Sequence, residues 1–243
     1  VVPLTMSAAG EFPSAVKASG GKLTGTVTAV ADAAAADTLV VPALGEDGPA
    51  LYAVHARDVT VTNEIPLDLT RGIATVELSD VDGHVLAERN RAVAALRTAL
   101  RTGAGILASE QLGLAQWCLD TTVRYLKERH QFGRPVGSFQ ALKHRLADVY
   151  LELVTARAAA RYAADELARA GSDVAVAVAL AASYCGQVAV HAAEEALQMH
   201  GGIGMTWEHP VHLYLKRAKS DQLALGTPGG HRAELAELVD LPA

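Results

Sequence analysis

Two short segments in the second half of the chain carry side chains suited to binding a nucleotide. In the first, residues 129–140, Arg129 offers a permanently charged, planar fork of donors that matches phosphate oxygens. Gln131 and Gln140 add neutral donors and acceptors nearby. This segment is therefore a candidate binding site for a diphosphate.

The second segment, residues 198–204, places a glycine pair after a polar side chain. Gly201 and Gly202 let the backbone approach a nucleotide closely, because neither residue carries a Cβ. Gln198, about one helical turn earlier, can hydrogen-bond a ribose or an adenine edge. Taken alone, Arg129 is more often a solvated charge and a glycine pair more often a helix C-cap, so the hypothesis rests on both segments together.

Both segments lie in a half of the chain whose pattern is helical. From about Arg89 the sequence is rich in Ala, Leu and Arg, with apolar residues three and four apart, as at Leu142, Leu146, Val149 and Leu153. This pattern predicts a bundle of long helices, of the four-helix type.

Capping and breaking residues predict where these helices begin and end. The Gly-Arg-Pro at residues 133–135 ends one long helix, and Ser138 caps the next. The Gly-Ser-Asp at residues 171–173 ends that helix and caps the third. Shorter helices are expected after Pro210 and Gly230.

The first part of the chain is expected to form a separate β domain. Short segments rich in Val, Thr and Ile are separated by Gly, Pro, Asp and Asn. The predicted strands are residues 22–30, 38–41, 51–55, 58–62 and 73–78. The fold class is therefore α+β, with a small antiparallel barrel or sandwich at residues 1–88 followed by a helical bundle at residues 89–243.

Composition excludes several classes of protein. The 243 residues are 50% hydrophobic, carry a net charge of −6 and contain no basic run, which argues against a nucleic-acid partner. No uninterrupted apolar stretch reaches the ~20 residues of a membrane span, and no export signal is visible after Val1. Cys118 and Cys185 are expected to be buried small side chains rather than a disulfide or a metal pair. We therefore expect a soluble protein of the reducing cytoplasm.

Together the two segments resemble the flavin-contacting signatures of acyl-CoA dehydrogenases. Residues 208–210 (Glu-His-Pro) and 216–219 (Lys-Arg-Ala-Lys) follow in the order and at about the spacing of that family. Residues 21–25 and 36–37 are similar to landmarks of the family's middle β domain, so the resemblance covers nearly the whole chain. The family's helical N-terminal domain is absent from this sequence.

The resemblance implies a role in the FAD-dependent α,β-desaturation of an acyl-CoA. In the family, the helical bundle of one subunit reaches across the dimer and holds the diphosphate and adenosine end of its neighbour's FAD. The residues to which this role carries over are Arg129, Gln131, Phe132, Gln140, Gln198, Gly201 and Gly202. The FAD is therefore expected to be shared with a partner subunit.

The position of the catalytic base departs from the family pattern. Desaturation requires a carboxylate that removes the α-proton while the β-hydrogen leaves as hydride. In most of the family this Glu precedes a Gly-Thr, and here Leu225 stands in its place. In a minority it lies on the first bundle helix, where Gly103 stands here, and Glu110 would lie about 10 Å along that helix. We therefore assign no catalytic residue to this chain.

Residues that contact flavin in the family's β domain are also replaced. Residues 5–11 (Thr-Met-Ser-Ala-Ala-Gly-Glu) stand where the family has Thr-Glu-Pro-x-x-Gly-Ser, which introduces Glu11. Residues 29–31 (Ala-Val-Ala) replace Trp-Ile-Thr, and residues 228–230 (Pro-Gly-Gly) replace a helix start that normally carries a flavin-contacting Gln or Glu. The isolated chain is therefore expected to bind little FAD.

The other candidate groups have structural explanations. The nine histidines lack the spacing of a metal site, so no metal is assigned, and they are expected at the surface or at interfaces. Glu194 and Glu195 are expected on a solvated helix face, and Glu208 at a helix start. Trp117 and Trp207 are expected to be core or interface anchors.

The leading hypothesis is the companion subunit of a heteromeric acyl-CoA dehydrogenase, resembling those of actinobacterial steroid and fatty-acid degradation. A heterotetramer with two copies of each chain would use a catalytic partner's base and flavin cleft. Its substrate would be an acyl-CoA such as a steroid side-chain thioester, and its electron acceptor an electron-transfer flavoprotein. One alternative is a self-sufficient homo-oligomeric dehydrogenase with Glu110 or Glu208 as base. The others are a non-enzymatic scaffold subunit and an oxidase that uses oxygen.

Overall fold

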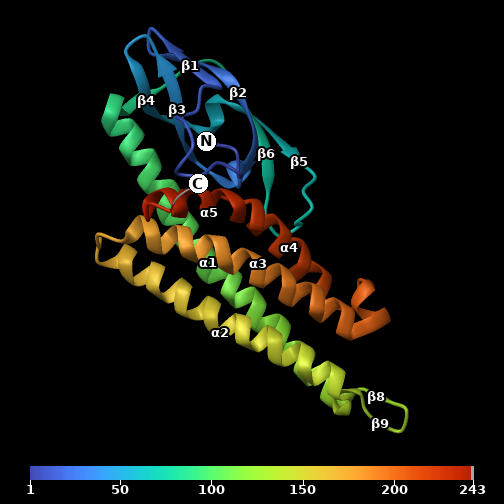
Figure 1. Ribbon diagram of the computed structural model, residues 1–243. Helices are drawn as coiled ribbons and strands as arrows, with labels where there is room; N and C mark the ends of the chain where they lie inside the picture. The colour runs from blue at the N-terminus through green and yellow to red at the C-terminus, as the bar shows by residue number, and fades with distance from the viewer. Residues whose placement is uncertain (242–243) are drawn as a thin grey trace. The chain divides into compact units, whose positions relative to one another are not determined.

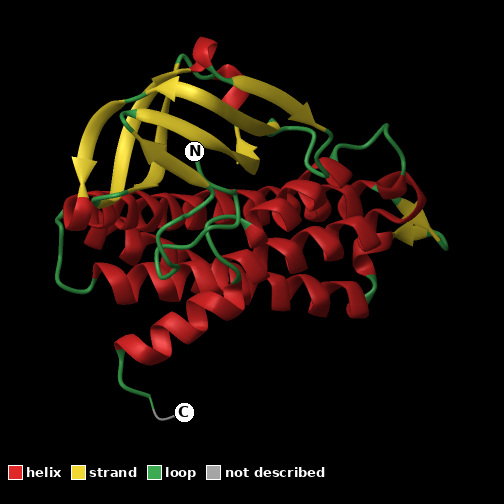
Figure 2. Cartoon of the chain, turned by 90° about the horizontal axis from the view of Figure 1, so that it is seen from above, coloured by secondary structure: helices red, strands yellow, loops and turns green. Residues whose placement is uncertain are grey.

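The computed structural model describes residues 1–241 (Figure 1). The chain divides into two compact units, Val1–Arg101 and Thr102–Ala243. The division falls inside the first long helix, α1 (Arg89–Glu128), whereas the sequence pattern changes at the start of that helix. Strands dominate the first unit, and helices dominate the second (Figure 2).

The first unit is built on a seven-stranded sheet with the order β5-β6-β2-β1-β3-β4-β7. Side chains that alternate along the strands form its core, in which Leu23, Val41 and Val76 are fully buried. Two 3-10 turns, η1 (Ala33–Ala35) and η2 (Ala56–Asp58), connect strands. The strands are β1 (Val16–Ser19), β2 (Lys22–Ala31), β3 (Thr38–Gly45), β4 (Gly48–His55), β5 (Thr60–Glu64), β6 (Ile73–Asp82) and β7 (His84–Glu88).

All of the predicted strands are present, with three differences. β1 and β7 were not predicted, because each is short and β7 has almost no buried residue to produce an alternating pattern. β1 pairs with β3 in parallel at Lys17 and Leu44. The sheet is therefore mixed, whereas a wholly antiparallel sheet was expected. β5 begins at Thr60 instead of Asp58, because residues 56–58 form η2.

Gly25 marks a close approach of two strands within this sheet. It lies at a register shift in the pairing of β2 with β6, and its φ is +157°. A Cβ added to Gly25 would lie 2.2 Å from the carbonyl oxygen of Ala15 and 2.8 Å from Cα of Val16. Glycine is therefore needed for β1 and β2 to pair at this position.

The second unit is a helical bundle, which confirms the predicted α+β fold class. After α1 its helices are α2 (Gln140–Ala168), α3 (Val174–His200), α4 (Val211–Leu223) and α5 (Pro228–Leu238). Between α1 and α2, the short strands β8 (His130–Gln131) and β9 (Arg134–Pro135) pair as a hairpin, and η3 (Val136–Ser138) follows. The 3-10 segment η4 (Gly201–Met205) follows α3.

α3 is the central helix of this unit. It packs against α2, α4 and α5, and its alanines allow close packing, with Ala181, Ala189 and Ala193 fully buried. The stretch Val174–Met205 is long and apolar enough to cross a membrane by length and composition alone. Because 56% of its most apolar 18-residue segment is buried inside the protein, we interpret this stretch as a core helix.

The apolar stripe predicted from residue 142 onward is the core-facing side of α2. Val149 and Leu153 are fully buried, and Leu146 is partly buried against the same cluster. Cys118 and Cys185 are free and buried, as the sequence predicted. Burial raises the pKa of both thiols to about 12, so they are side chains of the core.

Two predicted helix starts were wrong. Phe139, not Ser138, is the N-cap residue of α2, and the Ser138 hydroxyl is buried without a hydrogen-bond partner. α5 begins at Pro228 instead of after Gly230, because Pro is favoured in the first turn and the Thr227 side chain accepts a bond from the Gly230 N–H at 3.1 Å. Pro210 does precede α4, as predicted.

Truncating Leu153 to alanine should lower the free energy of unfolding by about 2–5 kcal/mol, because it removes a buried core side chain. Leu151→Ala on the same helix is the matched control, since Leu151 is 67% exposed. The control should change the free energy of unfolding by less than about 0.5 kcal/mol. Urea denaturation followed by circular dichroism measures both variants, and equal losses would contradict the assignment of the two faces of α2.

Candidate functional site

The two signature segments meet at one pocket of the helical unit. The pocket has a volume of about 450 Å³, which suits part of a nucleotide. It is lined by Tyr125, Arg129, Gln131, Val136, Met199, His200, Gly201, Gly202 and Ile203. The structure therefore brings the guanidinium of the first segment together with the glycine pair of the second.

The first wall of the pocket is the turn between α1 and α2. Phe132 and Gly133 both have positive φ (55° and 74°), which is the backbone of a two-residue hairpin turn between Gln131 and Arg134. The Arg134 guanidinium lies 3.9 Å from the centre of the Phe139 ring, and Phe132 meets the same ring edge-on at 6.1 Å. These contacts give the hairpin a defined shape.

Arg129 lies between the last turn of α1 and this hairpin. Its N–H donates to the Tyr125 carbonyl at 2.8 Å, and its own carbonyl accepts from the Val136 N–H at 2.7 Å. The backbone of Arg129 is therefore fixed on both sides. Within residues 1–241 its exposed guanidinium forms no ion pair, which leaves its donors to a ligand. Gln131 is less free, because its amide donates to the His130 carbonyl at 2.9 Å.

The second wall is the C-terminal end of α3. Gly201 is the C-cap of this helix, with φ +61° and ψ −137°, a conformation open only to glycine. Nothing lies within 4 Å of a Cβ built on Gly201 or on Gly202. The backbone there is uncovered, so a flat or charged ligand can approach it closely.

Three of the predicted binding residues do not line this pocket. Phe132 is 89% exposed at the tip of the hairpin. Gln140 and Gln198 are exposed at the start of α2 and near the end of α3. Their predicted contacts with FAD remain predictions.

Conversely, several pocket residues were not predicted. Met199 and His200 lie within the second segment, beside the glycine pair, and Tyr125 lies one helical turn before Arg129. That helical spacing is the signal that identifies Tyr125, because it places its side chain near the same end of α1. Val136 and Ile203 complete the apolar part of the lining.

The two residues that the resemblance aligns with the family's catalytic base, Gly103 and Leu225, lie close together. A Cβ added to Gly103 on α1 would lie 2.9 Å from Cδ1 of Leu225, which precedes α5. Leu225 has φ +58°, an unusual conformation for leucine. A methyl group of Leu225 thus fills the space beside Gly103, and neither residue has a side chain that can accept a proton.

The two proposed substitute bases are placed differently. Glu110 is held by Arg217 of α4 at 2.5 and 2.7 Å, and Arg217 also reaches Asp221 at 3.4 Å. Glu208 is exposed in the segment before α4, where its N–H donates to the Thr206 hydroxyl at 3.3 Å. Glu110 therefore forms an ion pair with Arg217, and Glu208 faces solvent.

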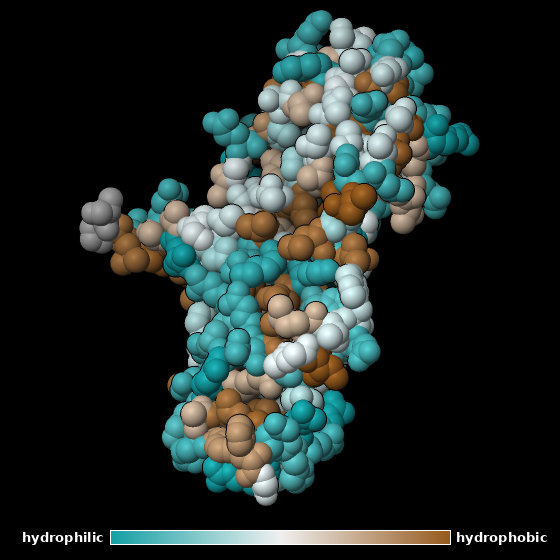
Figure 3. Space-filling view, turned by 90° about the vertical axis from the view of Figure 1, so that its right-hand side faces the viewer, coloured by the Kyte–Doolittle hydropathy of each residue, from teal (hydrophilic) through white to brown (hydrophobic). Residues whose placement is uncertain are grey.

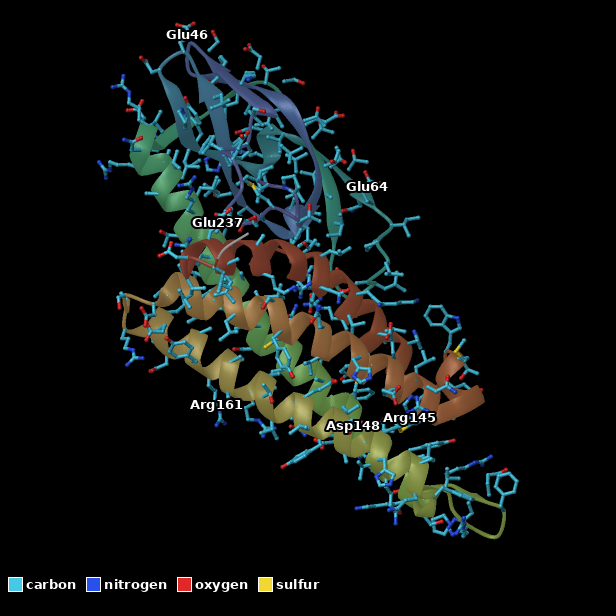
Figure 4. The ribbon with its side chains drawn as sticks, in the orientation of Figure 1. Glu46, Glu64, Arg145, Asp148, Arg161 and Glu237 are labelled. Atoms are coloured by element: carbon cyan, nitrogen blue, oxygen red, sulfur yellow. The ribbon has the colours of Figure 1, made fainter. Side chains whose placement is uncertain are left out.

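The expectation that Glu194 and Glu195 lie on a solvated helix face holds for only one of them. Glu194 is exposed and pairs with Lys219 at 2.9 Å. Glu195 is only 17% exposed and accepts two bonds of 2.6 Å from Arg145, labelled on α2 in Figure 4. This bidentate pair joins α2 to α3, a contact between residues far apart in the sequence.

The expectation for the histidines needs correction, whereas that for the tryptophans is confirmed at Trp117. His200 and His231 are buried and not at the surface, because each packs inside the helical unit. Trp117 is a core anchor that stacks on Tyr214 at 3.5 Å. Trp207 is 73% exposed and lies 4.6 Å from the Lys216 ammonium. Among residues 1–241, no group of three His, Cys, Asp or Glu side chains is placed to hold a metal ion.

The segment that the resemblance aligns with one of the family's flavin contacts borders only a small pocket within the first unit. Residues 6–12 and the first part of α1 enclose a pocket of only about 10 Å³, room for about one water. Ala29, in place of the family's tryptophan, adopts φ +55° and accepts a bond from the Leu4 N–H at 2.8 Å. This pocket is therefore small, and Ala29 supplies no ring where the resemblance expects a tryptophan.

A model of the acyl-CoA dehydrogenase C-terminal domain matches residues 92–239. The chain belongs to the acyl-CoA dehydrogenase family. This family is FAD-dependent and its members are oxidoreductases. Residues 92–239 include both walls of the pocket, Gly103 and Leu225.

Similar proteins include a mycobacterial dehydrogenase and two complexes. The acyl-CoA dehydrogenase IpdE2 of Mycolicibacterium smegmatis is 48% identical over 127 residues, which are 52% of this chain and 39% of IpdE2. A chain of the ChsE4–ChsE5 complex of Mycobacterium tuberculosis is 31% identical with a TM-score of 0.82, over 99% of this chain and 66% of that chain. A chain of a variant of the Tcur3481–Tcur3483 steroid acyl-CoA dehydrogenase is 29% identical with a TM-score of 0.78, over 93% and 62%. The chain thus spans less than two thirds of the length of each.

Proposed function

We propose that this chain is the companion subunit of a heteromeric acyl-CoA dehydrogenase and completes the FAD site of a catalytic partner in trans. One observation carries the proposal. The pocket retains the groups suited to a nucleotide diphosphate, whereas both positions of the family's base are filled by the contact between Gly103 and Leu225. A subunit of this kind contributes to binding and leaves proton abstraction to its partner.

The residues of the pocket fit the diphosphate and adenosine end of FAD. Arg129 provides a charged fork for the diphosphate oxygens, with no competing carboxylate bound to it among the described residues. Gly201 and Gly202 provide an open backbone against which the adenosine end can lie. FAD bound by the partner supplies the hydride acceptor of the desaturation.

The relatives support the heteromeric form of the proposal. Two of the similar structures are complexes of two different chains, ChsE4–ChsE5 and Tcur3481–Tcur3483, and the second is described as a steroid acyl-CoA dehydrogenase. We infer that this chain assembles with a catalytic acyl-CoA dehydrogenase subunit as a heterotetramer with two copies of each chain. The proposed substrate is an acyl-CoA with a bulky acyl group such as a steroid side chain, and the proposed electron acceptor is an electron-transfer flavoprotein.

Arg129→Ala should remove most of the FAD from the co-purified complex, because the diphosphate loses its charged fork. Arg129→Lys should restore only part of the occupancy, since an ammonium keeps the charge without the bidentate geometry. Arg124→Ala is the matched control, because Arg124 is also exposed on α1 and donates only to Thr121 among the described residues. Flavin absorbance per complex measures occupancy. Unchanged FAD affinity in Arg129→Ala would contradict the role in trans, and a stoichiometric yellow complex of the chain alone would favour a self-sufficient dehydrogenase.

Glu110→Gln and Glu208→Gln should leave the desaturation rate of the complex within a few-fold, because neither carboxylate serves as the base. Removing the partner's own catalytic Glu should abolish the reaction, since loss of a general base costs about 10²–10⁴-fold. The measurement is the rate of acyl-CoA desaturation with an artificial electron acceptor, at equal flavin content. A loss of 100-fold or more in either variant, with FAD retained, would make this chain a catalytic subunit.

A further inference from the structure

We propose that His200 is a positioning residue of the nucleotide pocket. Through Tyr125, His200 joins the wall that contains Gly201 to the wall that contains Arg129, and it does so only as a neutral imidazole. The inference rests on the proposed function. His200 and Tyr125 are not among the residues that the sequence motifs assign to cofactor binding.

Tyr125 connects the two walls directly. Its carbonyl accepts the N–H of Arg129 at 2.8 Å, so Tyr125 and Arg129 move together at the end of α1. Its ring stacks on the imidazole of His200 at 4.5 Å and 26°. Its hydroxyl donates to the His200 carbonyl at 3.3 Å, immediately before Gly201. Two contacts of the Tyr125 side chain therefore join the first wall of the pocket, with Arg129, to the second wall, with Gly201.

The hydrogen bonds of His200 define its protonation state. Nδ1 lies 2.7 Å from the carbonyl oxygen of Ala196, and because a carbonyl only accepts, Nδ1 carries the proton. His200 is 2% exposed, and its Nε2 has no hydrogen-bond partner among the described residues. A second proton on Nε2 would place a buried charge where nothing accepts its hydrogen bond.

The surroundings also oppose a positive charge on this ring. The His209 ring, from the segment before α4, lies 4.2 Å away, and Arg129 lines the same pocket. Within residues 1–241, no carboxylate is ion-paired with His200, His209 or His212. Burial lowers the pKa of His200 more than the bond to Ala196 raises it. Burial lowers the pKa of His209 too, with further lowering by the nearby His200 and His212.

These features give the pocket a defined dependence on pH. The assembled pocket favours neutral His200, so its contribution is complete above the ordinary histidine pKa of about 6.5 and decreases as pH falls below it. On protonation the ring is expected to move toward water and to release Ala196 and the stack with Tyr125. The Gly201 wall then loses its link to Arg129, and FAD binds more weakly.

The test is the dissociation constant of FAD from the complex of this chain with its co-purifying dehydrogenase subunit, measured by flavin fluorescence at pH 8 and pH 5.5. The wild-type constant should rise in acid by no more than about tenfold, the limit set at pH 5.5 by an ordinary histidine pKa of about 6.5. His200→Asn keeps a donor for the Ala196 carbonyl but loses the ring and its titration, so it should bind FAD more weakly than wild type at pH 8 and show no further rise of the constant in acid. His200→Phe keeps a stacking ring without a donor and should bind FAD weakly at both pH values. His144→Gln is the control, because His144 is exposed on α2, and it should behave as wild type.

The outcomes separate this inference from the proposed function. If His200→Asn retains the wild-type rise in acid, or if the wild type binds FAD more tightly at pH 5.5, the role of His200 is wrong and the proposed function stands. A complex without FAD at both pH values would overturn the proposed function and, with it, this inference. Long-range proton–nitrogen NMR of the histidine rings in the isolated chain provides a test without FAD. It should show the Nδ1–H form of His200 with a pKa below 6.5, and an Nε2–H form would overturn the inference.

Discussion

The close packing of α3 is the constraint on which the pocket depends. α3 is surrounded by α2, α4 and α5, and its small buried side chains leave no room for an axial shift of one helix past another. The end of α3 is therefore held where Gly201 and Gly202 face the end of α1. The bidentate pair of Arg145 with Glu195 fixes α2 to α3 near the same end. Core packing, and not the local sequence of either motif, sets the distance between the two walls.

Unusual backbone conformations occur at the pocket and at the residue that the resemblance aligns with the catalytic base. Gly201 takes a conformation that only glycine adopts easily, and this conformation uncovers the backbone at the pocket. Leu225 takes a left-handed conformation that costs a non-glycine residue about 1–2 kcal/mol. Its side chain packs on Gly103 and the bundle core, which offsets part of that cost. The turn before α5 thus combines a left-handed backbone with an apolar side-chain contact.

Local patterns predicted the elements better than they predicted the site. Alternation located the longer strands, and the three-and-four spacing located the core side of α2, because both signals are repeated along the element. β7 has almost no buried residue to produce such a signal, and β1 spans only four residues. Ser138 has the chemistry of a cap, but the chain enters α2 at Phe139, whose ring is held by Arg134.

The site was predicted only in the parts that motifs encode. Arg129 and Gly201 stand in recognisable segments, and the structure places both at the pocket. Tyr125 and His200 line the pocket because the ends of α1 and α3 meet at it. Neither sequence segment alone predicts the contact between these two side chains. The same applies to Glu195, which has the sequence context of an exposed helix face but finds Arg145 across the bundle.

The retained and the lost features are consistent with a division of work between unequal subunits. A nucleotide wall formed by one chain can serve a flavin held by another, so selection on Arg129 and Gly201 does not require a complete site in this chain. A base, by contrast, is useful only beside a flavin that accepts the hydride. A carboxylate in place of Leu225 would lie partly buried against α1, at the cost of desolvation and without a reaction to promote. Under the proposed function, leucine at this position is therefore tolerated, whereas the pocket is needed because the partner's cofactor depends on it.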